Sequence, residues 1–189
     1  MWLLMKQAYA QVQIPRRFVF VCVIGFILCL LAPVGLQRHG RPSNDGLVVF
    51  SDSYLRFIDT VVQTAIPVLL ADRIGMMQLV YVDVSTTVAT HGLKRLLDKW
   101  EIGGVRLGER PKGSNSHYNM PSGHSSMAAC AVYYVCRRYR FIHALYLTPI
   151  LLLTMYARVA LNAHTVTAVI AGALVGFSMA AIFTSKRRV

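Results

Sequence analysis

Acidic residues are scarce in this chain. Only 8 aspartates and glutamates accompany 20 lysines and arginines among 189 residues, which gives a formal net charge of +12. With 55% hydrophobic residues, the composition is also too apolar for an ordinary soluble domain of this length. The basic residues lie at the ends of apolar runs rather than along one polar face, which argues against nucleic acid as a partner. We therefore predict a membrane protein whose cations face anionic lipid headgroups and an acidic substrate.

The sequence also lacks the spacing of a metal site. Neither the cysteines nor the histidines and carboxylates form a ligand pattern, and all four cysteines lie within apolar runs: Cys22, Cys29, Cys130 and Cys136. We expect buried, reduced thiols and a protein that works without a metal or another cofactor. Nothing in the sequence implies an obligate protein partner.

Apolar runs dominate the rest of the chain, and a run of about 20 residues is enough to cross a bilayer. Six such runs occur, at residues 18–36, 54–70, 76–93, 122–136, 142–161 and 165–184. We predict an all-α fold in which six transmembrane helices form a polytopic bundle and residues 1–189 make one membrane-embedded domain. Gly172 and Gly176, four residues apart, predict close helix packing in the last run.

The N-terminal segment resembles neither a cleaved signal peptide nor a span. No small-x-small cleavage site follows the run 18–36, and the basic pair Arg16-Arg17 lies far from the first residue. We predict that residues 1–17 form a short helix in the membrane interface and that the first span is retained.

Basic clusters indicate how the bundle is oriented. With six spans, residues 16–17, 137–140 and 186–188 fall on one side, which the positive-inside rule makes cytoplasmic, together with both termini. The loop 94–121 and the turn 162–164 then lie on the opposite, periplasmic face. Because the loop is itself basic, against that rule, we expect positive charge to be needed there.

That loop ends in the sequence RLGERPKGSNSHYNMPSGHSS, residues 106–126. Helix N-termini present unpaired N–H groups and the positive end of the helix dipole, and this one begins near Ser122 and Gly123. Arg106, Arg110 and Lys112 lie just upstream, so a phosphate can meet cations and helix-end amides together. His124 adds a side chain that exchanges protons near neutral pH.

A second polar group lies at the junction of the last two runs. Arg158 and His164 are six residues apart, and a tight turn at Asn162 and Ala163 would let the arginine face the histidine. A charge within a span costs about 2.5–3.5 kcal/mol on insertion scales, so an intramembrane arginine is a functional candidate by default.

Arg-Pro, Pro-Ser-Gly-His and Arg-x5-His occur in this order at hydrophobic boundaries. Together they resemble the three motifs of the membrane type-2 phosphatidic acid phosphatase (PAP2) superfamily, over residues 54–184. Within it, RLGERP and NMPSGHSSM are most similar to the lipid A 1-phosphatases. The resemblance implies that His164 is a nucleophile forming a phosphohistidine and that His124 is the general acid. The implied phosphate ligands are Lys94, Arg110, Arg158, Arg106, Ser122 and Gly123.

Two positions depart from the family pattern. Gly103 stands where the family places a lysine seven residues before the Arg-Pro arginine, and Lys94 or Lys99 is the displaced equivalent. Ala168 stands where the family has an aspartate that orients the nucleophilic histidine. The possible substitutes in the sequence are Thr167, Asn162, Asp83 and Asp59.

The resemblance implies an integral membrane lipid phosphatase of the bacterial inner membrane, with its active site facing the periplasm. Its expected substrate is a phospholipid or glycolipid monoester, above all the 1-phosphate of lipid A. Phosphatidylglycerol phosphate and undecaprenyl pyrophosphate are alternative substrates, and lipid phosphotransfer is an alternative reaction. A non-catalytic lipid binder or transporter is the alternative outside enzymes, because the orienting aspartate is missing.

Overall fold

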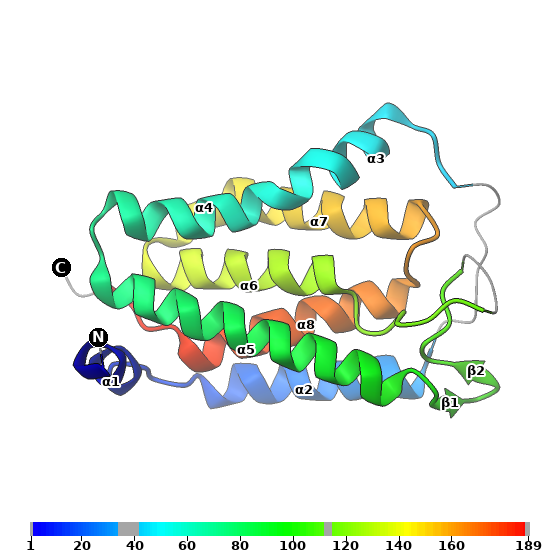
Figure 1. Cartoon of the computed structure of the whole chain (residues 1–189), viewed down its shortest axis with the longest axis horizontal. Coiled ribbons are helices and arrows are strands. Elements are labelled where there is room, and N and C mark those ends of the chain that lie inside the picture. Colours follow the sequence, from blue (N-terminus) through cyan, green and yellow to red (C-terminus); the bar gives the residue numbers. More distant parts are fainter. Residues whose placement is uncertain (1, 34–41, 112–114, 188–189) are drawn as a thin grey trace.

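A computed structural model describes residues 2–33, 42–111 and 115–187 and is largely helical (Figure 1). The long helices are α2 (Arg16–Leu31), α4 (Arg56–Leu69), α5 (Arg73–Leu97), α6 (Gly123–Arg138), α7 (Ala144–Ala160) and α8 (Val166–Phe183). The shorter elements are α1 (Trp2–Ala10), α3 (Gly46–Phe50), the π-helical turn η1 (Ser51–Leu55), the 3₁₀ turn η2 (Phe141–His143), and the paired strands β1 (Glu101–Ile102) and β2 (Val105–Arg106). The helical fold class is confirmed.

Each predicted apolar run corresponds to one long helix, although residues 34–36 of the first run lie outside the described residues. Among the described residues, two helical stretches are long and apolar enough to cross a membrane, Phe141–Ala160 and Val166–Phe183. Helices α2 and α6 have only 16 residues each, about 24 Å at 1.5 Å per residue, and α5 is long but carries charged side chains. The count of six spans therefore stays a prediction.

Helix α6 lies in the middle of the bundle and packs against α4, α5, α7 and α8, while α2 packs against α8 (Figure 1). The predicted close packing through glycines is confirmed. A Cβ added to Gly172 would lie 2.3 Å from the Ser122 carbonyl oxygen, and one added to Gly176 would lie 2.1 Å from that of Ser126. The absence of these side chains lets the N-terminal half of α6 rest directly on the backbone of α8.

At the end of the bundle that contains the N-terminus, α5 begins with a capped turn (Figure 1). Asp72 is the N-cap of this helix, and its carboxylate accepts the Gly75 N–H at 2.9 Å. Burial alone would raise the pKa of Asp72. The hydrogen bonds and charge of Arg138, together with the Gly75 N–H, outweigh burial and lower this pKa.

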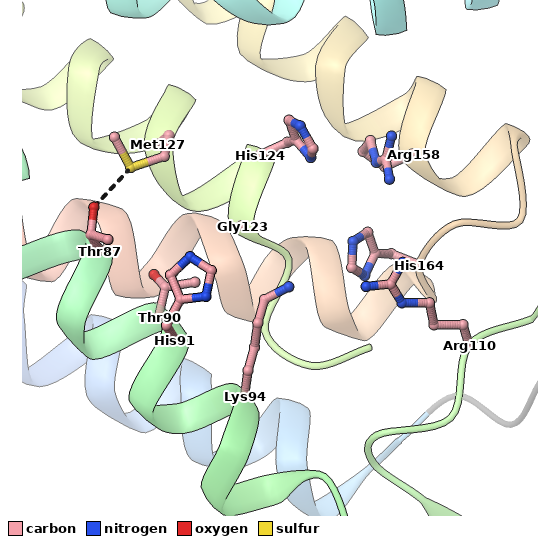
Figure 2. A pocket seen from close by; sticks show the side chains of 10 residues that line it. All are labelled: Thr87, Thr90, His91, Lys94, Arg110, Gly123, His124, Met127, Arg158 and His164. Atoms are coloured by element: carbon pink, nitrogen blue, oxygen red, sulfur yellow. Dashed lines mark hydrogen bonds between the residues drawn. The ribbon is translucent and has the colours of Figure 1, made fainter. Parts of the chain in front are cut away.

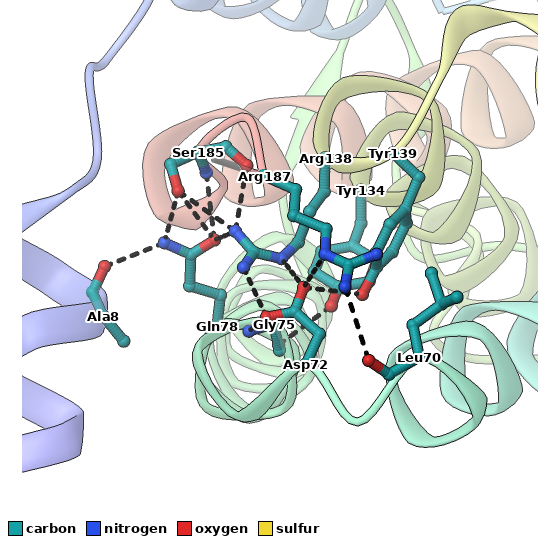
Figure 3. Close-up of polar contacts among 10 residues, drawn as sticks. All are labelled: Ala8, Leu70, Asp72, Gly75, Gln78, Tyr134, Arg138, Tyr139, Ser185 and Arg187. Atoms are coloured by element: carbon teal, nitrogen blue, oxygen red, sulfur yellow. Dashed lines mark hydrogen bonds and ion pairs between the residues drawn. The ribbon is translucent and has the colours of Figure 1, made fainter. Parts of the chain in front are cut away.

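Arg138 forms the centre of a polar network at this end (Figure 3). Its Nε and Nη2 each donate to Asp72 at 2.7 Å, and its Nη1 donates to Gln78 at 3.0 Å. Gln78 Nε2 in turn donates to the carbonyl of Ala8 in α1 and to the hydroxyl of Ser185 in the C-terminal segment. This Arg138 cluster, made of Asp72, Gln78, Arg138 and Ser185, ties both ends of the chain to α5. Arg138, which the sequence analysis grouped only with the basic cluster 137–140, is therefore a buried structural residue.

Candidate active site

Helix α6 begins at the Pro-Ser-Gly-His motif. Ser122 is its extended N-cap, but no side chain caps this helix end. The Ser122 N–H donates to the Ala168 carbonyl at 2.8 Å, and the residue is fully buried. Of the two predicted backbone ligands, Gly123 lines a cavity, whereas the N–H of Ser122 is used to join α6 to α8.

The turn between α7 and α8 brings the Arg-x5-His residues together. Asn162 has a positive φ of 52°, the left-handed conformation typical of a helix end. The Arg158 carbonyl accepts the N–H groups of Ala163 and His164 at 3.0 and 3.1 Å. The tight turn foreseen at Asn162 and Ala163 is present, and His164 begins the approach to α8 beside the last turn of α7.

A cavity of about 400 Å³ lies between these two motifs, and Figure 2 shows the side chains around it. Its lining comes from α5, the long loop, α6, α7 and the α7–α8 turn: Thr87, Thr90, His91, Lys94, Arg110, Gly123, His124, Met127, Arg158 and His164. Both histidines thus share one cavity with three cations. We call it the cationic pocket.

Other predicted phosphate ligands lie elsewhere. Arg106 is not among the lining residues, and its Nη2 donates to the Ser116 carbonyl at 2.6 Å within the loop. Lys112 lies outside the described residues. Of the two candidate lysines, Lys94 is buried and lines the pocket, whereas Lys99 is exposed in the turn after α5. Lys94 Nζ and Arg110 both donate to the carbonyl of Tyr118, at 3.3 Å each.

His164 is held by a backbone carbonyl. Its Nδ1 lies 2.7 Å from the Asn119 oxygen, and because a carbonyl only accepts, Nδ1 carries the hydrogen and Nε2 is left with a lone pair. Burial lowers the pKa of His164 well below its ordinary value, and the neighbouring Lys94 and Arg110 charges lower it further. The ring is therefore neutral at pH 7 and its Nε2 can act as a nucleophile.

Asn119 is a residue that the sequence analysis missed. Its side-chain oxygen accepts the Thr165 N–H at 3.0 Å, its side-chain nitrogen donates to Thr165 Oγ1 at 3.1 Å, and its own N–H donates to Gly108 at 2.9 Å. The carbonyl that orients His164 is thus anchored on both sides. A hydrogen bond accepted by a main-chain carbonyl has no side-chain signature, so no sequence signal identified it.

Three of the suggested substitutes for the missing aspartate, Asp83, Asp59 and Thr167, make no hydrogen bond to His164 in the described part of the chain. Asp83 accepts from Gln63 at 2.9 Å, and both carboxylate oxygens of Asp59 are buried without a hydrogen-bond partner in the described part of the chain. Thr167 contacts Thr165 at 3.3 Å. The Asn119 carbonyl takes the place that the sequence analysis looked for among side chains.

Asp52 and Arg56 were also missed. Arg158 Nη1 donates to Asp52 at 2.5 Å, and Arg56 Nη1 lies 3.2 Å from His124 Nε2. An arginine in the first turn of an apolar helix, with an acid four residues earlier, is the signal that could have drawn attention to them.

The pocket is built to hold an anion. Three fixed cations, Lys94, Arg110 and Arg158, surround it, and helix α6 points its N-terminus toward it. Across the residues that the structure describes, no group of three or more histidine, cysteine or acidic residues has the geometry of a metal site. The chemistry available from the chain itself is a neutral histidine, a second histidine and a cationic cavity large enough for a phosphate group.

Comparison with known proteins agrees with this chemistry. A family model described as the PAP2 superfamily matches residues 60–188. A lipid A 1-phosphatase of Helicobacter pylori strain 26695 is 38% identical over 188 residues, which are 98% of this chain and 97% of that protein. A protein of the same name from strain J99 is 44% identical over 138 residues, 73% of this chain and 71% of that one.

A more distant relative and a solved structure were also found. The lipid A 4'-phosphatase of Helicobacter pylori strain J99 is 32% identical over 166 residues, 86% of this chain and 82% of that protein. The crystal structure of a transmembrane PAP2-type phosphatidylglycerolphosphate phosphatase from Bacillus subtilis is 20% identical with a TM-score of 0.45, covering 94% of this chain and 79% of that one. By the family match and the identity of its relatives, the chain belongs to the PAP2 superfamily and is a membrane phosphatase.

Proposed function

We propose that this protein removes the 1-phosphate of lipid A, or of a lipid A precursor, by way of a phosphohistidine. The observation that carries the proposal is the cationic pocket, where His124 and His164 share one cavity with Lys94, Arg110 and Arg158. The names of the relatives that cover most of the chain support the choice of substrate.

The reaction begins with attack on phosphorus. His164 Nε2 forms a bond to phosphorus while the bond between phosphorus and the sugar oxygen breaks, and protonated His124 gives its proton to the departing oxygen. Lys94, Arg110 and Arg158 hold the phosphoryl oxygens, whose charge they balance throughout. Neither a metal nor another cofactor takes part.

The second step releases phosphate. His124, now neutral, removes a proton from a water molecule as that water attacks the phosphohistidine. The bond from phosphorus to Nε2 breaks, inorganic phosphate leaves, and both histidines return to their starting forms.

We propose further that the chain is one domain with six spans, both termini in the cytoplasm of a bacterium and the pocket at the periplasmic face of the inner membrane. Residues 1–17 then lie in the interface and the loop 94–121 covers the active site. The distribution of the basic clusters supports this orientation. The partners are the glycolipid substrate and the surrounding membrane lipids.

The test uses the purified, detergent-solubilised protein with bisphosphorylated lipid A in the presence of EDTA. Mass spectrometry of the lipid should show the loss of one phosphate from the reducing-end sugar, and the phosphate should appear in water. His164→Ala should abolish release, whereas His143→Ala, at the other end of the bundle, should retain it. Loss of the 4'-phosphate, transfer of labelled phosphate to lipid, or full activity of the His164 variant would contradict the proposal.

A further inference from the structure

Asp52 and Arg56 form a pair beside the cationic pocket. Asp52 lies in the π-helical turn η1 and Arg56 begins α4, so one turn separates them, and their charged atoms are 3.9 Å apart. Neither residue is among those that line the cavity. π-Helical turns occur often at functional sites, because they turn side chains away from the regular helical pattern.

Each member of the pair contacts one residue of the pocket. Asp52 accepts from Arg158 Nη1 at 2.5 Å, which links η1 to α7. Arg56 Nη1 lies 3.2 Å from His124 Nε2, which links α4 to α6. A single turn of the chain therefore holds a phosphate ligand and the general acid, which come from two different helices.

The contact with Asp52 leaves Arg158 able to bind phosphate. Only Nη1 is used by Asp52, and Nε of Arg158 is buried without a hydrogen-bond partner among the described residues. A long arginine side chain loses about 2 kcal/mol of rotamer freedom when it is immobilised. Because Asp52 already restricts Arg158, the substrate meets a guanidinium that is preorganised.

The contact with Arg56 selects one form of His124. Arginine has only donors, so His124 Nε2 must be the acceptor and the ring proton sits on Nδ1 in the empty site. Protonation of His124 at Nε2 for the reaction replaces the Arg56 contact at that atom, and once the proton has passed to the leaving oxygen Arg56 again donates to the lone pair that is left. Arg56 thus stabilises the ring that proton donation produces.

We infer that Asp52 and Arg56 are positioning residues, Asp52 for phosphate binding through Arg158 and Arg56 for proton donation through His124. This inference rests on the proposed function, because it assigns the two contacts to separate parts of that reaction. The pair itself forms and breaks no covalent bond.

The separation of roles predicts a dependence on the leaving group. An alkoxide must be protonated as it departs, whereas a nitrophenolate leaves without help. The probes are dodecyl phosphate and a nitrophenyl phosphate that carries a dodecyl chain, assayed side by side in one detergent. Arg56→Gln should lower kcat on the alkyl probe by about 10²-fold and leave the aryl probe within about threefold of the parent.

Asp52→Asn should act differently. Because Asp52 acts through Arg158, which binds the phosphate, we expect KM to rise about tenfold on both probes alike. Arg56→Lys should recover part of the alkyl activity, since it restores a donor near His124. Arg95→Gln, an exposed arginine on α5, is the matched control and should change neither probe.

An equal loss on both probes by Arg56→Gln would overturn the role of Arg56, since a merely structural role predicts that pattern. Unchanged KM in Asp52→Asn would overturn the role of Asp52. The proposed function fails separately. If the parent protein hydrolyses both probes and the variants differ from it as expected, but lipid A stays intact, the assignment of substrate is wrong and the roles of Asp52 and Arg56 are supported.

Discussion

The two ends of the bundle each contain an arginine bound to an aspartate, Arg138 buried and Arg158 partly buried, but the arginines differ in how completely they are satisfied. Arg138 is 3% exposed, and its Nε, Nη1 and Nη2 all donate to protein acceptors. Arg158 uses Nη1 on Asp52, and its Nε is buried without a partner in the described part of the chain. Every nitrogen of the Arg138 guanidinium therefore has a protein acceptor, whereas Nε of Arg158 has none among the described residues.

The charges around each arginine show the same contrast. At the Arg138 cluster, Asp72 accepts two short hydrogen bonds from one guanidinium, as expected of a structural ion pair. At the cationic pocket, Lys94, Arg110 and Arg158 share one cavity, and among the described residues Asp52 on η1 is the carboxylate paired with one of them, Arg158. An excess of cations that are buried or partly buried is costly unless an anion binds, so unmatched charge distinguishes the site from the scaffold.

The largest effect should follow from breaking the structural pair. Arg138→Met leaves buried Asp72 with only the more exposed Arg187, 4.0 Å away, as a cation, which should lower the free energy of unfolding by about 3–5 kcal/mol. Thermal unfolding in detergent measures this, and the folded fraction should keep its kcat. Arg140→Met, an exposed neighbour, is the control. A variant as stable as the parent would mean that the two ends do not differ as described.

The next effect concerns the loop residue that holds His164. Asn119→Ala removes both side-chain hydrogen bonds to Thr165, so its carbonyl is free to drift from the histidine. Because small misplacements in an active site are expensive, kcat on lipid A should fall about 10²-fold. The buried Thr165 N–H left without its acceptor should lower the free energy of unfolding by about 1–3 kcal/mol. Asn115→Ala, exposed in the same loop, should have no effect. Equal activity of the two variants would show that the carbonyl needs no anchor.

A smaller effect should come from the contact between α6 and α8. Gly172→Ala places a Cβ against the Ser122 carbonyl, and such overpacking typically costs about 1–3 kcal/mol. Activity should fall too, because the displaced segment carries His124. Gly92→Ala has open space around its Cβ and should instead gain about 1 kcal/mol from helix propensity. Similar melting temperatures for both variants would contradict the close approach.

The smallest effect is the acid dependence of the Arg138 cluster. Because the folded-state pKa of Asp72 is lowered, its contribution is fully present above the unfolded value of about 4 and is lost as the pH falls through the folded pKa. The melting temperature of the parent should therefore fall below about pH 4. Asp72→Asn should be less stable at pH 7 and should have a flatter profile. If the stability of Asp72→Asn changed with pH in the same way as that of the parent, Asp72 would be excluded as the titrating group.

Much of the helical framework was predictable. Apolar runs indicated where the long helices lie, since a chain in a lipid environment must satisfy its backbone hydrogen bonds within each helix. The glycines at 172 and 176 predicted the close approach of α8 to a neighbour. The boundaries were less accurate at α5, where the polar side chain of Asp72 extends the helix by capping it.

The candidate site was predictable only in part. Lys94, Arg110, His124, Arg158 and His164 are chemically distinctive residues at the ends of apolar runs, and they line one pocket. Their supporting contacts were not foreseen, because Arg56 is 68 residues from His124 and Asp52 is 106 residues from Arg158 in the chain. Neither pairing has a local pattern.

By itself, the sequence determined the helical class, the order of the helices and the reactive residue types, because these depend on local composition and short spacing. Only the tertiary structure decided which groups orient the two histidines. A carbonyl from a loop holds one ring and an arginine from another helix holds the other. Such contacts depend on how distant segments pack, and any residue can supply the carbonyl, so one-dimensional spacing contains no record of them.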